Sequence, residues 1–472
     1  MNGPIRFLLN DRLVASARAP GELLLDVLRS EFGLVGVKAG CREGDCGACA
    51  VLLGELREGE LRYRSVTSCL VLLGQVAGLH VVTIEALRLA SGLGPVQRAV
   101  AEEGATQCGF CTPGVVVSTT MSVLEDDDLA PTTLEDAMAG HLCRCTGYAS
   151  FRRVARRLAE EFCTRPAARD ERLRALVDAD VLPASFLHAA ADLRALADQR
   201  EAHSTDQAAG TLVAGGTDLL IGSTRGESLA EPLTRRLSSV ASSIDGDALV
   251  FDAGTTFEEL RNSEHFGELD GLAHAHLDRV ASRLIRERAT LGGNIVNASP
   301  IADLVVMLLA LDAELVLRGA QGERRLPLER FYRGYKEVDL APGEWVDAAR
   351  LSRARQLRGF EKVSKRQFLD IASVNAAASF DVDEGGQLSN VRIAVGGVAP
   401  IPLVLRGCMA SLEGQSVASE LVRDAALAAD GEIAPISDVR GSAAYKRLLT
   451  RQLIYALFIE ALPGYPLEEL IS

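Results

Sequence analysis

The spacing of apolar residues near the start of the chain predicts two strands followed by a helix. Ile5, Phe7 and Leu9 recur at every second position, as in a strand, and the Asn-Asp pair at 10–11 is a turn signal. Residues 13–14 begin a return strand. Apolar residues then recur with helical spacing over 23–32. Gly33 follows, and glycine is common directly after the end of a helix.

Helical spacing dominates the next part of the chain, up to residue 163. We expect three helices there: one over 115–124 that begins at Pro113, one capped by Thr132 or Thr133 that ends near residue 138, and one capped by Ser150 that ends near residue 162. Residues 164–182 are charged, rich in Ala and Arg and weakly patterned, so they are expected to be an interdomain linker.

The remainder of the chain mixes strands and helices. An apolar strand with a Gly-Gly turn occupies 212–220, and a buried apolar segment occupies 304–311. Strands at 374–382 and 388–398 precede a closing helix at 445–462. The whole pattern predicts a multidomain α+β protein.

Composition narrows the function classes. The 472 residues carry 50 Lys and Arg against 64 Asp and Glu, a formal charge of −14, which argues against a broad nucleic-acid-binding face. The longest apolar stretch, 304–311, is far shorter than the roughly 20 residues that span a bilayer. No apolar run resembling a secretory signal precedes Asp11. We therefore expect a cytoplasmic protein without a membrane segment.

Eight of the ten cysteines form two sets. The first thiol set has the spacing C-x4-C-x2-C followed by a distant fourth cysteine, which is typical of plant-type [2Fe–2S] sites; it consists of Cys41, Cys46, Cys49 and Cys69. Glycines at 40, 44 and 47 allow the tight backbone that points N–H groups at sulfur. A strand pair, a helix and this loop follow one another in a β-grasp-like order. A four-cysteine zinc site is the alternative, but it usually consists of two C-x2-C pairs.

The second thiol set combines C-x2-C with a later C-x-C. It consists of Cys108, Cys111, Cys143 and Cys145, and we expect it to lie at helix ends of the small helical domain. Helix N-termini stabilise anionic sulfur, so this set is a second candidate for a [2Fe–2S] cluster. Cys163 and Cys408 match neither set and are expected to be small buried thiols.

Two Gly-Gly turns carry the remaining candidate chemistry. LVAGGTD at 212–218 and TLGGNIVNASPIAD at 290–303 match neither G-x-G-x-x-G nor a P-loop. Such turns can hold a pyrophosphate through exposed N–H groups, although taken alone each is more simply a plain turn.

These blocks together resemble a known family. CREGDCGACAV, SCL, QCGFCTPG and HLCRCTGY, within residues 1–163, are similar to the two-cluster iron–sulfur module of the molybdenum hydroxylases, the xanthine dehydrogenase and aldehyde oxidase group. VAGGTD and TLGGNIVNASPIADL resemble the two flavin-binding segments of the same family. The resemblance implies a plant-type ferredoxin domain (1–80), a helical-bundle [2Fe–2S] domain (81–163), an α+β FAD-binding domain (183–350) and a small α+β C-terminal domain (351–472) that closes the flavin site.

The resemblance also implies roles for single residues. The first flavin segment would hold the pyrophosphate and adenosine side of FAD with Leu212, Val213, Ala214, Gly215, Gly216, Thr217 and Asp218. The second would form another phosphate turn with Thr290, Gly292, Gly293 and Asn294, and would hold the ribityl and ring-proximal hydroxyls with Ser299 and Asp303. Asp303 could instead cap the helix that follows it.

This chain departs from the family near the flavin ring. A family aromatic residue falls at Val280, and a lysine of some animal members falls at Ser373. Lys362, Lys365 and Arg366 could face the phosphates of NAD, or could equally form a solvated surface.

By resemblance, the chain is the iron–sulfur and FAD subunit of a two-chain bacterial member that oxidises hypoxanthine and xanthine to urate. Its partner would be a large molybdopterin-binding subunit, assembled as two copies of each chain, and its electron acceptor would be NAD⁺. The same module in an aldehyde or aromatic-compound dehydrogenase, a stand-alone NADH:acceptor diaphorase and a non-enzymatic iron–sulfur sensor remain as alternatives.

Overall fold

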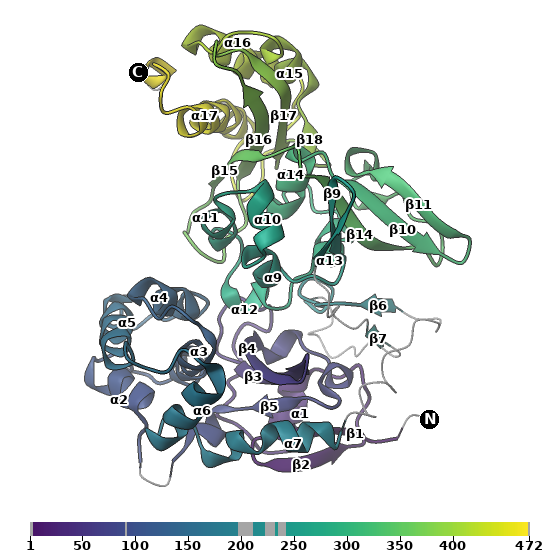
Figure 1. The fold of residues 1–472 in the computed structure, drawn as a ribbon. Coiled ribbons are helices and arrows are strands. Elements are labelled where there is room, and N and C mark those ends of the chain that lie inside the picture. Colours follow the sequence, from purple (N-terminus) through teal and green to yellow (C-terminus); the bar gives the residue numbers. More distant parts are fainter. Residues whose placement is uncertain (1–2, 90–91, 197–210, 222–231, 235–241, 471–472) are drawn as a thin grey trace. The chain divides into compact units, whose positions relative to one another are not determined.

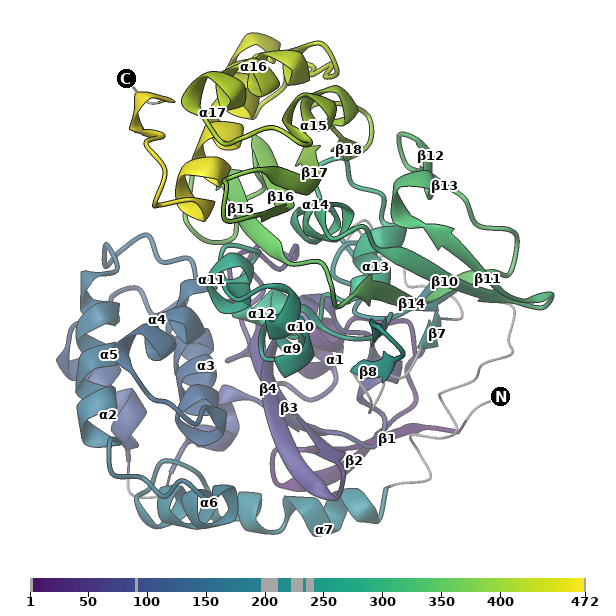
Figure 2. The same ribbon diagram turned by 45° about the horizontal axis from the view of Figure 1, so that its top comes forward.

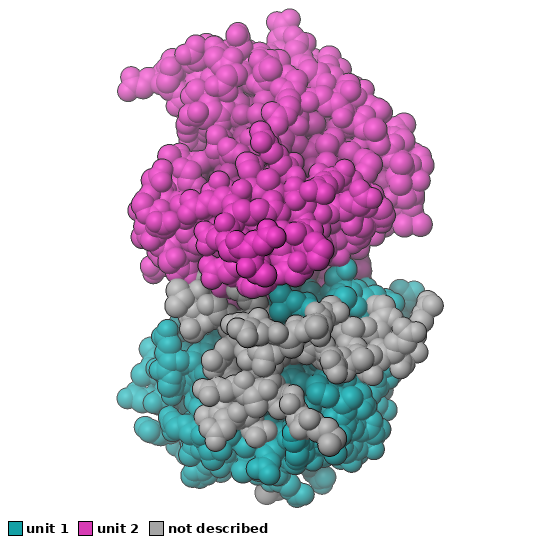
Figure 3. All heavy atoms as spheres, turned by 90° about the vertical axis from the view of Figure 1, so that its right-hand side faces the viewer, with its two compact units in different colours: residues 1–239, 282–289 teal, residues 240–281, 290–472 magenta. Residues whose placement is uncertain are grey.

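A computed structural model of the chain describes residues 3–89, 92–196, 211–221, 232–234 and 242–470. The chain divides into two compact units. Unit 1 comprises residues 1–239 and 282–289, and unit 2 comprises 240–281 and 290–472 (Figure 3). The chain therefore leaves unit 2 for eight residues, contributes them to unit 1 and returns. Each unit is described on its own below.

Unit 1 begins with a five-stranded sheet in the order β2-β1-β5-β3-β4 (Figure 1). Its elements are β1 (Ile5–Leu9), β2 (Arg12–Ser16), α1 (Leu24–Ser30), β3 (Ala50–Arg57), β4 (Glu60–Thr67) and β5 (His80–Val82). The first two strands pair antiparallel around the turn at Asn10, whose φ is +57°, while β1 and β5 pair in parallel. This is the predicted β-grasp order, and the predicted helix is α1.

Successive side chains along these strands point to opposite faces of the sheet, and both faces are covered. On one face, Val51 and Leu53 share a core with Leu24 and Leu28 of α1. On the other, Leu52 belongs to the core of the helical part of the unit. Helix α3 packs directly on β3 and β4 there. The sheet therefore lies between α1 and the helices that carry the second thiol set.

The helical part of unit 1 contains α2 (Pro95–Glu102), α3 (Thr112–Glu125), α4 (Pro131–Ala139), α5 (Ala149–Glu161), α6 (Arg169–Asp178) and α7 (Ala189–Arg194). The three predicted helices correspond to α3, α4 and α5, but two predicted caps are wrong. Helix α4 begins at Pro131 after Ala130, because proline suits a first helical position. Helix α5 follows Tyr148, which has a left-handed backbone, so Ser150 lies inside the helix.

The segment expected to be a linker, 164–182, contains helix α6. Arg172 on this helix is buried, and its guanidinium donates hydrogen bonds to the carbonyls of Leu124 and Asp126 at the end of α3. A buried arginine caps α3 here, and this long-range contact explains why a polar segment is folded. Unit 1 also contains the parallel pair β6 (Thr211–Val213) and β7 (Pro232–Thr234), and helix α12 (Arg283–Arg286).

Unit 2 contains two larger sheets and a small two-stranded one. The first has the order β11-β10-β14-β9-β8, with strands β8 (Ser242–Asp245), β9 (Ala248–Asp252), β10 (Glu314–Gly319), β11 (Gly322–Pro327) and β14 (Trp345–Ser352). The small sheet pairs β12 (Tyr332–Gly334) with β13 (Glu337–Val338). The helices that accompany them are α9 (Phe257–Arg261), α10 (Glu264–Leu269), α11 (Ala273–Asp278), α13 (Leu291–Val296) and α14 (Asp303–Ala310).

The second sheet, β15-β16-β17-β18, lies between helices (Figure 2). Its strands are β15 (Leu357–Val363), β16 (Val374–Val382), β17 (Leu388–Gly396) and β18 (Leu403–Val404), followed by α15 (Arg406–Leu412), α16 (Ser419–Asp430) and α17 (Ala443–Ala461). Along β16, Ala376 and Phe380 pack toward these three helices, whereas Ser379 donates a hydrogen bond to the carbonyl of Ala310 on α14. The predicted strands and closing helix are confirmed.

Candidate functional site

The loop that carries the first thiol set points backbone amides at sulfur. The Cys41 amide lies 3.4 Å from Cys46 Sγ and the Glu43 amide 3.3 Å from Cys41 Sγ. A Cβ added to Gly40 would lie 2.7 Å from Cys46 Sγ, so a larger residue would displace the thiol. The fourth member, Cys69, follows β4 on a short turn of 3₁₀ helix and is fully buried.

The first thiol set forms two pairs. A hydrogen bond with the Cys46 thiol lowers the pKa of Cys41 to about 5, against the effect of burial, while the pKa of Cys46 is raised. The hydrogen bond with Cys69 likewise lowers the pKa of Cys49 and raises that of Cys69. A [2Fe–2S] cluster takes four cysteine thiolates, two for each iron. Paired thiols within a shell of amide donors fit this cluster.

The second thiol set is paired in the same way at the start of α3. Cys111 is the N-cap residue of this helix, and burial together with its neighbour Cys143 raises the pKa of Cys111 to about 12. The thiols of Cys108 and Cys145 form the other pair, and both residues are exposed. The Thr146 hydroxyl lies 3.2 Å from Cys143 Sγ. In each predicted set the structure therefore places the four cysteines in two pairs, while among the described residues no three such side chains are grouped to share a single metal ion.

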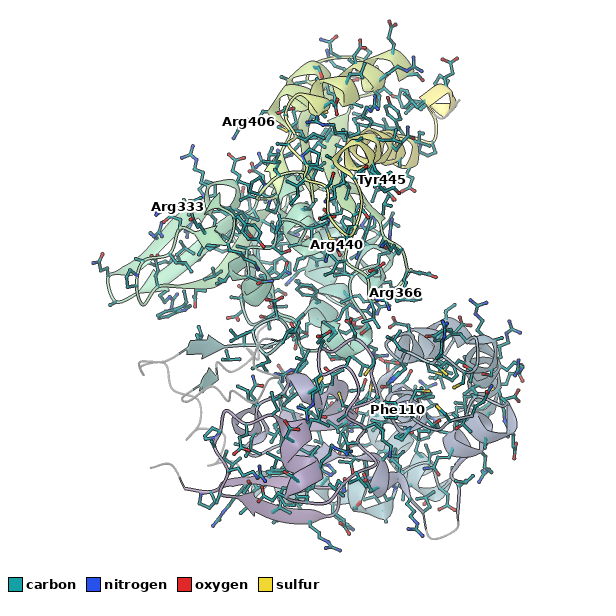
Figure 4. All side chains as sticks on the ribbon, turned by 180° about the vertical axis from the view of Figure 1, so that it is seen from behind. Phe110, Arg333, Arg366, Arg406, Arg440 and Tyr445 are labelled. Carbon is teal, nitrogen blue, oxygen red and sulfur yellow. The ribbon has the colours of Figure 1, made fainter. Side chains whose placement is uncertain are left out.

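The loops that carry Cys108 and Cys145 expose three large apolar side chains beside the exposed polar residues Gln107 and Arg144. Phe110, labelled in Figure 4, is 47% exposed, and Leu142 and Tyr148 are each 41% exposed. Large apolar side chains that gather around a functional centre often mark an interaction surface.

The first flavin segment, Leu212–Asp218, lies in unit 1 and is held by two residues that the sequence analysis missed. The Gln75 side chain donates to the carbonyl of Ala214 at 2.8 Å. The guanidinium of Arg288 donates to the carbonyl of Gly215 and to Gln75 Oε1, both at 2.7 Å. A trans peptide directs its N–H away from its C=O. With these carbonyls occupied, the amides of Gly215 and Gly216 point to the opposite side, as a phosphate site requires.

Close packing explains the glycines of this turn. A Cβ on Gly215 would collide with the backbone carbonyl of Arg288, and Gly216 has φ +72°. Arg288 is buried, and desolvation together with repulsion from Arg64 lowers its pKa to about 9. Its position two residues before Thr290 was the only signal in the sequence that could have drawn attention to it.

The second flavin segment lies in unit 2. Thr290 caps α13 by accepting a hydrogen bond from the Gly293 amide at 3.1 Å. Gly292 approaches Ala253 so closely that a Cβ would lie 2.7 Å from the alanine methyl. The side-chain oxygen of Asn294 is buried without a hydrogen-bond partner among the residues that the structure describes. An orphaned hydrogen-bond acceptor beside a glycine turn fits a donor on a ligand, such as a sugar hydroxyl of FAD.

The predicted ring-proximal residues lie at the start of α14. Ser299 accepts a hydrogen bond from the Ile301 amide at 3.4 Å. Asp303 is the first residue of α14 and does not cap it, since the N-cap residue is Ala302. Its carboxylate lies 2.7 Å from the ammonium of Lys362 and also accepts from Asn375.

Lys362 is therefore neither solvated nor free for a nucleotide phosphate, because its side chain is 4% exposed and paired with Asp303. The position of the family lysine, Ser373, is buried, and its hydroxyl donates to the carbonyl of Arg440. In this chain the cation beside Asp303 is Lys362, on β15. Val280, at the family's aromatic position, is buried as well.

Four family models match successive parts of the chain. They are described as a 2Fe-2S iron–sulfur cluster binding domain (residues 8–73), a [2Fe-2S] binding domain (83–156), the FAD binding domain in molybdopterin dehydrogenase (184–351) and the CO dehydrogenase flavoprotein C-terminal domain (360–461). They follow the chain in the order that the resemblance implied.

Xanthine dehydrogenase 1 of Arabidopsis thaliana is 30% identical over 92% of this chain, and the xanthine dehydrogenase of Emericella nidulans is 28% identical over 87%. The chain spans only 38% and 35% of the length of these two relatives. Among solved structures, a carbon monoxide dehydrogenase of Hydrogenophaga pseudoflava is similar, with 27% identity and a TM-score of 0.50 over 54% of this chain and 90% of that one. The chain therefore belongs to the molybdenum hydroxylase family, in which it corresponds to the portion that carries two [2Fe–2S] clusters and FAD.

Proposed function

We propose that this chain is the electron-transfer part of a cytoplasmic, NAD⁺-dependent xanthine dehydrogenase that oxidises hypoxanthine and xanthine to urate in purine catabolism. When bound, the two clusters carry single electrons and the FAD combines them into a hydride for NAD⁺. The observation that carries the proposal is that unit 1 contains both paired thiol sets and the first flavin turn, whose backbone is held by hydrogen bonds from Gln75 and Arg288. All ten cysteines are free thiols, as expected for a reducing compartment.

The residues of the chain hold and tune these groups. Cys41, Cys46, Cys49 and Cys69 would bind one cluster, and Cys108, Cys111, Cys143 and Cys145 the other. Amides at Cys41 and Glu43 donate to sulfur, which offsets the negative charge of bound thiolates. Gln75 and Arg288 orient the first flavin turn, and Asn294 offers an unpaired acceptor on the second.

The partner is proposed to be a molybdopterin-binding chain that covers the second thiol set. Phe110, Leu142 and Tyr148 are exposed in the loops that carry Cys108 and Cys145, and a molybdenum cofactor is named for the similar carbon monoxide dehydrogenase. Obligate interfaces of this kind bury on the order of 2,000 Å² or more. Two copies of each chain related by a two-fold axis would give the commonest closed arrangement.

A second candidate is the same electron-transfer part in an enzyme that acts on an aldehyde or another small molecule. Aldehyde oxidase 4 of Cavia porcellus is 26% identical over 96% of this chain, and the C-terminal match is to a CO dehydrogenase flavoprotein domain. The substrate would then be chosen by the partner, while the clusters and the FAD would do the same work.

Reconstitution tests the proposal. The chain is mixed with a candidate molybdenum-bearing chain, and urate and NADH are followed together after xanthine is added. We expect both products in equal amounts. Formation of urate with hydrogen peroxide and without NADH would overturn the assignment of NAD⁺ as the electron acceptor. Turnover of an aldehyde in place of xanthine would favour the second candidate. Xanthine oxidation by this chain alone would contradict the division of labour between the two chains.

A further inference from the structure

The loops that carry the two thiol sets meet inside unit 1. The Leu142 amide, one residue before Cys143, donates a hydrogen bond to the carbonyl of Cys46 at 3.1 Å. One hydrogen bond and a short run of covalent bonds therefore join a residue of the first thiol set to a residue of the second. Phe110 approaches from the same side, since a Cβ on Gly40 would lie 3.4 Å from its ring.

His141 occupies the centre of this junction. Its side chain is fully buried, and its Nε2 lies 2.9 Å from the Ser118 hydroxyl of α3. The other side of the ring lies against Gly47, between Cys46 and Cys49, so that a Cβ on Gly47 would collide with Nδ1. The ring therefore fills the space between the loop of the first thiol set and α3.

The junction has no room for extra atoms. Gly47 has φ +65°, and a Cβ there would also lie 2.5 Å from the carbonyl of Gly140. A Cβ on Gly114, in the first turn of α3, would collide with the carbonyl of Gly47. The separation of the two loops is thus fixed by the thickness of one imidazole ring and by two glycines, and packing this close transmits small displacements.

We propose that His141 is a positioning residue that sets the separation of the two cluster sites and thereby the rate at which an electron passes between them. In that exchange one electron leaves a reduced centre at the second thiol set and reduces an oxidised centre at the first, with no proton or group transferred. The inference rests on the two clusters of the proposed function. It is independent of the substrate, the acceptor and the partner.

The test compares His141→Ala with His80→Ala in the full-length chain, loaded with both clusters. His80 is a matched control, because it is equally buried and also contacts one hydroxyl, that of Tyr63, and one backbone group, the carbonyl of Asn10. After full reduction, the magnetic interaction between the clusters is measured by electron paramagnetic resonance. The rate of electron exchange is measured after pulsed partial reduction.

We expect His141→Ala to strengthen the magnetic interaction and to speed the exchange, because without the imidazole ring the two loops can close on each other and both effects grow as the centres approach. His80→Ala should leave both unchanged at the same iron content. Gly114→Ala, which pushes the Gly47 carbonyl away, should have the opposite effect, a weaker interaction and a slower exchange, and it decides the question if His141→Ala loses a cluster.

Unchanged coupling and rate in cluster-loaded His141→Ala or Gly114→Ala would overturn the inference. An unmodified chain that binds no iron–sulfur cluster would instead overturn the proposed function itself, so the two failures are distinguishable.

Discussion

Arg288 buries a positive charge beside the first flavin turn, and its two hydrogen bonds go to neutral oxygens of Gln75 and Gly215. Desolvation makes such a charge unfavourable, which is why its pKa falls to about 9. An anion nearby would compensate it. The pyrophosphate that the turn is expected to bind would supply that anion, so Arg288 both shapes the turn and favours its ligand.

Replacing Arg288 by methionine should therefore weaken FAD binding about tenfold, since hydrogen bonds from a charged group contribute roughly 1.5–3 kcal/mol each. The FAD content after gel filtration and the dissociation constant from flavin fluorescence measure the effect. Arg333→Met is the control, because Arg333 is exposed and paired with Asp339 (Figure 4). Full FAD retention in Arg288→Met, or loss of iron together with FAD, would contradict this role.

His80 predicts a pH dependence of stability. It is buried between Tyr63 and Asn10, and burial lowers its pKa to about 4. The unfolded chain protonates a histidine near pH 6.5, whereas the folded chain does so only near pH 4. Between these values the unfolded state binds more protons, so acidification destabilises the folded protein, and the full contribution is present above about pH 6.5.

Between pH 7 and pH 5, the free energy of unfolding should therefore fall by about 2 kcal/mol less in His80→Gln than in the unmodified chain. Denaturant unfolding at the two pH values measures the difference. His274→Gln provides the control, because this residue is exposed and its replacement removes no buried ring. An identical pH response in His80→Gln would show that this histidine is not buried in the neutral form.

At the scale of elements, periodicity in the sequence was a good guide wherever a segment had one dominant pattern. The 374–382 strand and the long closing helix were predicted within a few residues, because each buries a regular face. Helix starts were predicted less well. The start of α5 depends on Tyr148, whose left-handed backbone belongs to the loop of the second thiol set and whose hydroxyl accepts from the Cys143 amide.

The residues of the candidate site were likewise predictable only where the signal is local in the sequence. All eight cysteines could be located from spacing, since the ligand pattern lies within short stretches of chain. Gln75, Arg288 and Lys362 could not be found, because each acts on a residue far along the chain, such as Asp303 for Lys362. Contacts of that kind depend on tertiary packing, which periodicity does not report.

Each cluster loop is expected to bind its metal centre separately. Cys46→Ser should remove one paramagnetic signal of the reduced chain and Cys143→Ser the other, because each replaces one thiolate of a four-ligand set. Iron, acid-labile sulfide and electron paramagnetic resonance are measured on the same samples. Cys408→Ser is the control, since this thiol belongs to neither set and is buried as predicted, whereas the prediction that Cys163 is buried is wrong because that residue is exposed. Stoichiometric zinc without labile sulfide in the unmodified chain would contradict the assignment.

At the scale of the whole molecule, the isolated chain should contain four iron atoms, four labile sulfides and one FAD, and should reduce artificial dyes with NADH. It should not hydroxylate xanthine, because the proposed molybdenum centre belongs to the partner. Metal analysis, flavin release and dye reduction check this expectation. Release of FMN in place of FAD would show that 212–218 and 290–303 do not hold a dinucleotide. Among the described residues, no helix is both long and apolar enough to cross a bilayer.

The excursion of residues 282–289 into unit 1 has a consequence for synthesis. Arg283 pairs with Asp126, and Arg286 pairs with Asp136, so the helical part of unit 1 gains two ion pairs from a segment that is made about 150 residues later. Domains generally fold as units while the chain is produced from its N-terminus. Unit 1 therefore gains these two ion pairs only once the ribosome has also released much of the segment that matches the FAD binding domain. The iron–sulfur unit of this chain is thus completed later than a ferredoxin whose contacts all lie within one continuous segment.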